Sequence, residues 1–219
     1  MRYADDCSIF VKSERAGIRV LASISGFLEK KLKLKVNLRK SKVDKPHKRK
    51  LLGYSFIPSK DPMIKIAPES IKKLKVHLKP IFRKGRGKKL RSFIVEDLNP
   101  VLRGWANYFS LISGKKTLTK LDMWIRRRIR NLLWRRWRSF ESRFKVFKTL
   151  LPKDEARLAA LSGKGPWFNS GTKLVNAAFN LDFFRKYGLV CLTEIWKGNE
   201  AYRRTALVRN RMPGGVGGR

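Results

Sequence analysis

Acidic residues are scarce in this sequence. Its 219 residues contain 16 Asp and Glu against 53 Lys and Arg, which gives a formal net charge of +37. A compact protein with such a charge repels itself unless a polyanion neutralises it. Nucleic acid is the expected polyanion, because each phosphate that a protein contacts releases bound counterions.

Cysteine and histidine are rarer still. The two cysteines, Cys7 and Cys191, lie far apart, and the two histidines, His47 and His77, stand among lysines. These positions show no zinc-ligand spacing and no disulfide framework. A reducing, cytoplasmic environment is therefore expected.

Long apolar runs are also missing. No stretch of roughly 18 apolar residues occurs, so no membrane-spanning helix is expected, and residues 1–15 lack the apolar core of a secretory signal. Binding to an anionic membrane surface would require one amphipathic basic helix or a short polybasic cluster. Here the basic residues run the length of the chain and alternate with aromatic residues, which favours nucleic acid over a membrane.

Apolar residues make up 42% of the chain, enough for a core, and their pattern changes near residue 66. The first part predicts an α+β unit of antiparallel strands plus a helix. A hairpin is expected near the N-terminus with Asp5 and Asp6 in its turn, followed by a helix that begins at Ser13-Glu14. Strands are expected over residues 7–12, 32–38, 51–57 and 63–66.

The second part, from residue 67, predicts an all-helical domain that ends near residue 205. A helix should begin at Pro68 and kink or stop at Pro80, and another should break at Asn99-Pro100. The strongest helix should begin at Thr119. Its expected buried stripe is Leu121, Ile125, Ile129, Leu132 and Leu133. Residues 139–166 predict a helix and a loop, residues 174–187 a helix, and residues 206–219 a disordered tail.

Asp5 and Asp6 stand out because adjacent acids are unusual in so basic a chain. A β-turn explains two aspartates without any further role. However, these two lie between apolar residues, where a pair of carboxylates suits Mg²⁺ and phosphoryl transfer. Two ions would need more acids than this pair, and Asp44 and Asp61 are expected to be solvated loop residues.

The strongest helix carries seven arginines within residues 126–138, and Asp122 is its only acid. A solvated charged face would normally mix both signs, so binding to RNA phosphate is the better interpretation. A second basic patch covers residues 84–89, and a third segment ends the preceding helix, where Tyr108 is the best candidate for stacking on bases. The expected RNA-binding residues are Lys84, Arg86, Lys88, Lys89, Arg103, Asn107, Tyr108, Arg126, Arg127, Arg130, Arg135, Arg136 and Arg138.

Several stretches, in this order, resemble group II intron-encoded reverse transcriptases/maturases. Tyr3-Ala4-Asp5-Asp6 is similar to the YxDD catalytic box, and residues 32–42 are similar to the strand and Lys-containing turn that follow it. Residues 51–56 (LLGYSF) resemble the family's "LG[FY]xF" segment. Residues 98–109 (LNPVLRGWANYF) resemble the signature of the maturase domain, and residues 167–192 resemble the end of that domain.

The resemblance implies three regions: the C-terminal part of a reverse-transcriptase palm at 1–66, a thumb and maturase-specific helical domain at 67–205, and the tail. It implies Mg²⁺ as cofactor at Asp5 and Asp6, together with a third Asp that an N-terminal reverse-transcriptase segment would supply. Contacts with nucleotide or primer would come from Tyr3, Ala4, Lys40, Lys42 and Gly53. For Gly53, a bulge between strands is an equally good explanation. The implied partners are group II intron RNA and template–primer RNA or DNA.

Three functional hypotheses follow. The chain is an RNA-binding protein that assists intron folding and splicing. Alternatively, it is an RNA-directed DNA polymerase, a Mg²⁺-dependent nucleotidyltransferase, when an N-terminal segment completes the site. The third hypothesis is a remnant of a mobile element without function. A general ribosomal-type RNA-binding protein would not explain the acid pair, and the Cys/His pattern of an HNH nuclease is absent after His77.

Overall fold

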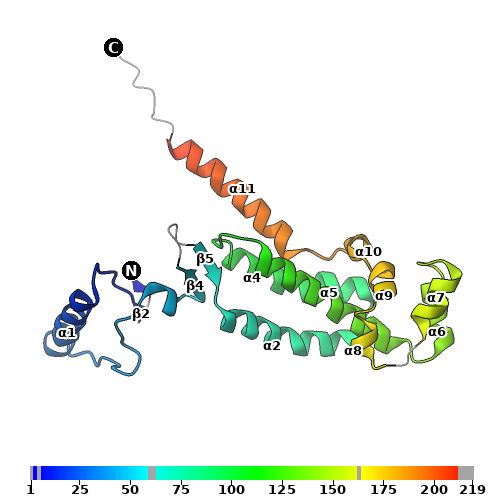
Figure 1. Cartoon of the computed structure of the whole chain (residues 1–219), viewed down its shortest axis with the longest axis horizontal. Helices are drawn as coiled ribbons and strands as arrows, with labels where there is room; N and C mark the ends of the chain where they lie inside the picture. Colours follow the sequence, from blue (N-terminus) through cyan, green and yellow to red (C-terminus); the bar gives the residue numbers. More distant parts are fainter. Residues whose placement is uncertain (1, 4–5, 59–62, 162–163, 212–219) are drawn as a thin grey trace, which may run out of the picture. The chain divides into compact units, whose positions relative to one another are not determined.

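The computed structural model describes residues 2–3, 6–58, 63–161 and 164–211, without the side chains of residues 2–6 and 203–211. The protein is mostly helical, with a small three-stranded antiparallel sheet near the N-terminus (Figure 1). It divides into two compact units, Met1–Pro62 and Met63–Arg219. This boundary is close to the change of pattern that the sequence shows near residue 66. None of the helices in the described ranges is long and apolar enough to cross a membrane.

The N-terminal unit begins with the predicted hairpin. β1 (Arg2–Tyr3) pairs antiparallel with β2 (Asp6–Cys7), and Tyr3 lies opposite Asp6. Asp6 therefore belongs to a strand and not to the turn, and the strand expected over residues 7–12 does not extend beyond Cys7. The predicted helix start is confirmed: the Ser13 hydroxyl accepts a hydrogen bond from the Ala16 amide at 3.2 Å and caps α1 (Glu14–Lys30).

The strand predicted over residues 32–38 is wrong. The structure has no strand there, and Lys33 adopts a positive φ of 56°. Leu32, Leu34 and Leu38 are each more than half exposed. Alternation of apolar and polar residues predicts a strand only where a neighbouring strand and a core are available. No strand in the described part of the chain pairs with this segment.

A tight hairpin replaces the single strand predicted over residues 51–57. β3 (Lys50–Leu51) pairs antiparallel with β4 (Tyr54–Ile57), and Leu51 lies opposite Tyr54. The two residues between them, Leu52 and Gly53, have φ of 50° and 78°, as a two-residue type I′ turn requires. The strand predicted over residues 63–66 is confirmed as β5 (Met63–Ile66), which begins the C-terminal unit.

The C-terminal unit is built from β5 and a series of helices. Ile64 of β5 exchanges two hydrogen bonds of 2.9 Å with Ser113, one through the serine hydroxyl and one through its amide. The helices, in order, are α2 (Pro68–Lys84), η2 (Gly85–Gly87), α3 (Leu90–Ser92), the π-helix η3 (Phe93–Leu98), α4 (Asn99–Tyr108), α5 (Lys116–Arg136), α6 (Phe140–Phe147), α7 (Lys153–Ala160), α8 (Pro166–Asn169), α9 (Lys173–Ala178), α10 (Leu181–Lys186) and α11 (Leu192–Arg211). A short 3₁₀ turn, η1 (Pro46–Lys48), belongs to the N-terminal unit.

The prolines change these helices less than the sequence predicts. α2 does not stop at Pro80 but continues to Lys84. The expected break at Asn99-Pro100 is also absent, because η3 leads directly into α4. The Asn99 amide bonds to the Ile94 carbonyl, five residues back. This wider turn accommodates the chain before Pro100 without ending the helix.

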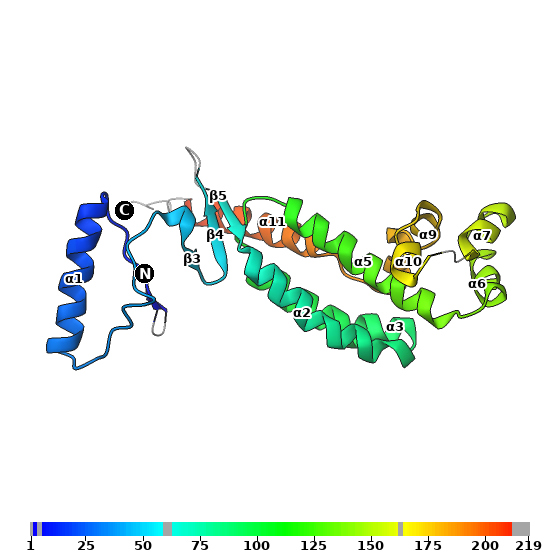
Figure 2. The same cartoon turned by 60° about the horizontal axis from the view of Figure 1, so that its bottom comes forward.

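α5 lies at the centre of the unit and contacts α2, η2, α8 and α11 (Figure 2). Its predicted buried stripe is confirmed, since each of the five side chains is at most 4% exposed. Aromatic side chains continue the core beyond the end of α5: Phe147 packs against Trp134 and Phe179, with ring centroids 5.9 and 5.6 Å apart. Burial of these rings supplies much of the stabilisation of the unit.

The C-terminal third contains more helices than the sequence predicts. Two helices, α6 and α7, replace the single helix and loop expected over residues 139–166. The helix expected over residues 174–187 is split into α9 and α10, because Asn180 caps α10 by accepting a hydrogen bond from the Phe183 amide at 2.9 Å. α11 continues to Arg211, past the predicted boundary at residue 205.

Candidate nucleic-acid interface

The arginines of α5 do not all face solvent. Arg130 is 8% exposed and donates from Nε to the Ser170 carbonyl at 2.9 Å and from Nη1 to the Phe179 carbonyl at 3.2 Å. Burial lowers the pKa of Arg130 to about 10, and Arg126 and Arg127 add to this effect. Its guanidinium therefore remains charged at neutral pH and ties α5 to the segment from α8 to α10.

Arg136 has a similar role at the other side of α5. Its Nη2 donates to the carbonyls of Gly85 and Lys88, at 2.8 and 2.6 Å. These carbonyls follow the C-terminus of α2, where a cation is electrostatically favourable. Gly85 itself is required here, since a Cβ at this position would meet the Phe93 ring at 2.4 Å. The segment from Lys84 to Lys89 is thus a structured turn that contains η2.

Arg127 and Arg128 lie against indole rings. The Arg127 guanidinium is 4.2 Å from the Trp167 ring and donates to the Trp167 carbonyl at 3.1 Å. Arg128 is 5.0 Å from the same ring and 5.2 Å from the ring of Trp124. Such contacts hold the two guanidiniums in place through cation–π attraction.

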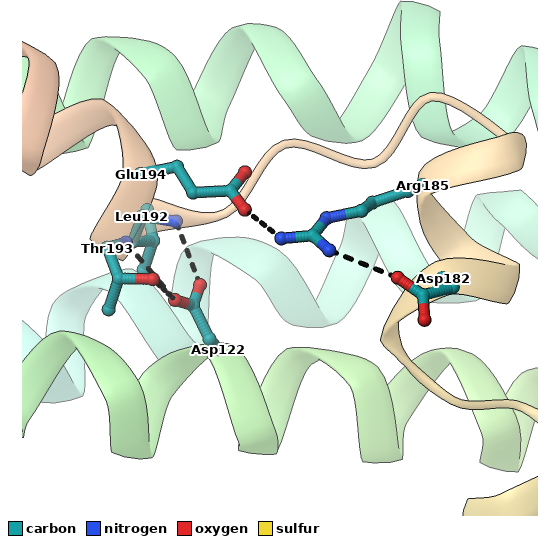
Figure 3. Close-up of polar contacts among 6 residues, drawn as sticks. All are labelled: Asp122, Asp182, Arg185, Leu192, Thr193 and Glu194. Carbon is teal, nitrogen blue, oxygen red and sulfur yellow. Dashed lines mark hydrogen bonds and ion pairs between the residues drawn. The ribbon is translucent and has the colours of Figure 1, made fainter.

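The one acid of α5 is a capping residue. Asp122 accepts hydrogen bonds from the amides of Leu192 and Thr193 at 2.9 and 3.1 Å and from the Thr193 hydroxyl at 2.9 Å (Figure 3). It therefore satisfies the first amides of α11. Burial raises the pKa of Asp122, and these hydrogen bonds oppose the increase. Asp122 thus uses its hydrogen bonds to cap α11, while its charge also interacts with that of Arg126.

Arg185 links α10 to α11. It forms ion pairs with Asp182 of α10 and Glu194 of α11 (Figure 3). These partners raise the pKa of Arg185, chiefly through the hydrogen bond with Glu194. All three side chains are about half exposed or more, so solvent screens the pairs and they contribute little to stability.

The remaining cations form the candidate interface. Arg135 and Arg138 are exposed on and just after α5, and Arg126 is half-buried. Lys84, Arg86, Lys88 and Lys89 are exposed at the end of α2, where Lys88 pairs with Asp97 at 2.8 Å. Arg136 hydrogen-bonds into this turn, so the basic residues predicted in two separate segments lie next to each other. We call this set, with Lys79 and Arg83 of α2, the basic surface.

The third predicted RNA-binding segment lies at the end of α4. The contacts of its residues are with Phe109 and with α11, not with Arg136. Arg103 and Asn107 are exposed, and the Asn107 amide oxygen accepts a hydrogen bond from Asn199 of α11 at 3.0 Å. Tyr108 is 55% exposed and packs edge-on against Phe109 at 4.8 Å. Phe109 is 5% exposed and belongs to the core.

The predicted metal site falls largely outside the described residues. Ala4 and Asp5 are not described, and only the backbone is described for Tyr3 and Asp6. Lys40 and Lys42 are exposed, and Gly53 is the second residue of the type I′ turn. Asp44 is exposed, as expected, while Asp61 lies outside the described residues. Within the described ranges, no three His, Cys, Asp or Glu side chains could together hold a metal ion.

Three arginines with defined contacts or positions in the structure are missing from the RNA-binding residues predicted from the sequence. Arg83 and Arg128 line the space between α2 and α5. The spacing of Lys79, Arg83 and Arg86 in the chain could have indicated that they share one face. Arg143 is 7% exposed and donates to the carbonyls of Arg138, Ser139 and Ala160. No sequence signal separates a buried arginine of this kind from an exposed one.

A comparison with known families finds a match over part of the chain. The group II intron maturase-specific domain matches residues 71–151, a range that includes most of α2, all of α4 and α5, and the LNPVLRGWANYF stretch. No curated protein matches the chain significantly. The matched domain implies binding of intron RNA and a role in splicing. Residues 71–151 of this protein are a group II intron maturase-specific domain.

Proposed function

We propose that this protein is the C-terminal part of a group II intron reverse transcriptase/maturase and that it binds intron RNA through the basic surface to promote folding and splicing. The observation that carries the proposal is that the residues of the basic surface all lie within the range that matches the maturase-specific domain. Phosphate neutralisation by lysine and arginine is the sequence-independent source of such affinity. The remaining exposed positions, Arg103, Asn107 and Tyr108, are proposed as a second contact region for RNA.

Binding and splicing assays test this proposal together. The 219-residue protein is titrated into a labelled transcript that contains a group II intron, at several KCl concentrations. Tight binding at low salt that weakens steeply as KCl rises is expected, with faster appearance of ligated exons at low Mg²⁺. A group I intron transcript of equal length serves as the control. Absence of tight binding at low salt would contradict the proposal.

A polymerase is the second candidate function, and the antiparallel pairing of β1 with β2, the strand that contains Asp6, favours it. Asp5 and Asp6 would hold Mg²⁺, which would stabilise charge in phosphoryl transfer. Two carboxylates alone are a small ligand set for this ion. We therefore expect no primer extension by this chain by itself, measured with an RNA template, a DNA primer and Mg²⁺. Extension that Asp5→Asn abolishes would establish the enzymatic function instead.

A further inference from the structure

A pocket of about 270 Å³ opens in the basic surface between α2, η2 and α5. Its volume is slightly below the ~300–1,000 Å³ typical of pockets that enclose a drug-sized molecule. Among the described residues that line it, none is acidic. Its polar lining consists of Lys79, Arg83, Arg86, Arg128, Asn131 and Arg135.

Two polar groups of this lining are buried without a partner. Arg128 Nε and Asn131 Nδ2 are inaccessible to solvent and, within the described part of the chain, have no hydrogen-bond partner. Asn131 is only 8% exposed. Buried donors are normally satisfied, so an unpaired pair in one pocket indicates that the pocket takes a ligand with acceptor oxygens.

Neighbouring groups hold these donors in place. The Asn131 amide oxygen accepts a hydrogen bond from Arg135 Nε at 3.2 Å, which leaves the amide nitrogen of Asn131 as the open donor. The rings of Trp124 and Trp167 flank the Arg128 guanidinium at 5.2 and 5.0 Å. Burial lowers the pKa of Arg128, and the nearby charge of Arg135 lowers it further. The pocket therefore concentrates positive charge, and an anion would relieve this repulsion.

The chemistry of the lining identifies the anion. Arginine presents its donors as a planar fork that matches the oxygens of a phosphate, and five cations exceed what a single carboxylate needs. Exposed basic residues continue from the pocket along the end of α2, as a chain of phosphates would require. We propose that this pocket binds a backbone phosphate of the RNA and so fixes the position of the RNA strand on the basic surface. The inference rests on the proposed function and adds a defined contact point to it.

Two double variants test whether the pocket itself binds phosphate or whether only the overall positive charge of the protein matters. Arg83→Gln/Arg86→Gln removes two exposed cations of the pocket. Lys72→Gln/Lys73→Gln removes two exposed cations of α2 that do not line the pocket. Both variants lose the same charge at exposed positions, so both should fold, which circular dichroism checks.

The affinity of each protein for the intron transcript is then measured against KCl concentration. We expect the pocket variant to bind at least about tenfold more weakly than wild type at low salt. The slope of log K against log[KCl] should become shallower by about 1 for each phosphate that the variant no longer neutralises. The control variant should change affinity less than about threefold. Equal decreases in affinity in the two variants would overturn the inference that the pocket binds a phosphate. RNA binding, and with it the proposed function, would still stand.

A second measurement tests the pocket without RNA. Wild-type protein is titrated with inorganic phosphate against chloride at constant ionic strength, and the fluorescence of the tryptophans beside Arg128 is followed. Wild type and control should show a saturable change that the pocket variant lacks. Absence of this change in wild type would overturn the inference, as would polyglutamate displacing RNA from the protein better than polyphosphate of equal length does, since the pocket would then prefer carboxylates.

Discussion

Buried and half-buried arginines act in this protein as donors to backbone carbonyls. Arg130, Arg136 and Arg143 each bind carbonyl oxygens from segments distant in the chain or at helix ends. A single guanidinium offers five donors in a fixed fork, so one side chain can satisfy two or three carbonyls at once. Because acidic side chains are scarce in this chain, many of these arginines donate to backbone carbonyl oxygens instead.

This use of arginine limits what could be predicted about the interface. The sequence correctly indicated a group of arginines on α5, and the maturase-specific domain implies binding of intron RNA. However, Arg130 and Arg138 are the same residue type in the same basic run, and one is 8% exposed while the other lies exposed to solvent. Which carbonyl lies within reach depends on the packing of α8 and α9, which helical periodicity within α5 does not encode.

Exchanging these two arginines for glutamine should separate stability from binding. Arg130→Gln is expected to lower the free energy of unfolding by about 1.5–3 kcal/mol, because two buried carbonyls lose a charged donor. Its folded fraction should keep wild-type affinity for RNA. Arg138→Gln should change stability by less than about 0.5 kcal/mol and should weaken RNA binding. Urea unfolding and RNA titration of both variants measure this, and loss of RNA affinity with unchanged stability in Arg130→Gln would contradict the structural role.

At the scale of elements, prediction succeeded where a segment carries its own signals. α1 begins at the predicted cap Ser13, α2 begins at Pro68, and α5 buries the predicted stripe. It failed where the outcome depends on partners elsewhere. Residues 32–38 alternate like a strand but have no neighbouring strand in the described chain. Residues 174–187 look like one helix, yet Asn180 starts a new one because its side chain caps α10.

α2 shows that packing can outweigh a strong local signal. Pro80 lacks the amide that would bond within the helix, and its ring crowds the preceding turn, yet α2 continues to Lys84. Leu74, Leu78 and Phe82 on either side of it are at most 9% exposed. Their burial along one face keeps the helix continuous across the proline.

Replacing this proline should therefore stabilise the protein. Proline in a helix interior costs ~3 kcal/mol relative to alanine, and its restriction of the unfolded chain offsets ~1 kcal/mol of that. Pro80→Ala is expected to raise the free energy of unfolding by about 1–2 kcal/mol, measured in urea. His77→Ala, at an exposed position of the same helix, should change it by less than about 0.7 kcal/mol. A lower stability for Pro80→Ala would mean that the proline fixes a bend that the packing of α2 needs.

At the scale of the whole molecule, the charge of +37 makes folding and RNA binding respond to salt in opposite directions. Like charges on the free protein repel each other, and salt screens this repulsion as the Debye length falls from ~10 Å at 0.1 M to ~3 Å at 1 M. Bound RNA neutralises the same charges, so the complex gains nothing from that screening. Salt instead weakens the complex, because the release of counterions on binding becomes less favourable.

Thermal unfolding should reveal this opposition directly. The melting temperature of the free protein is expected to rise with KCl, by about 2–4 °C for each kcal/mol of repulsion that is screened. Saturating intron RNA should raise the melting temperature at low KCl by stabilising the folded state, and this increment should shrink as KCl increases until the two curves converge. Sucrose at equal osmolality controls for general effects of solutes. A free protein whose melting temperature falls with KCl would show that attractive pairs such as Lys88–Asp97 outweigh the repulsion among the cations of the basic surface.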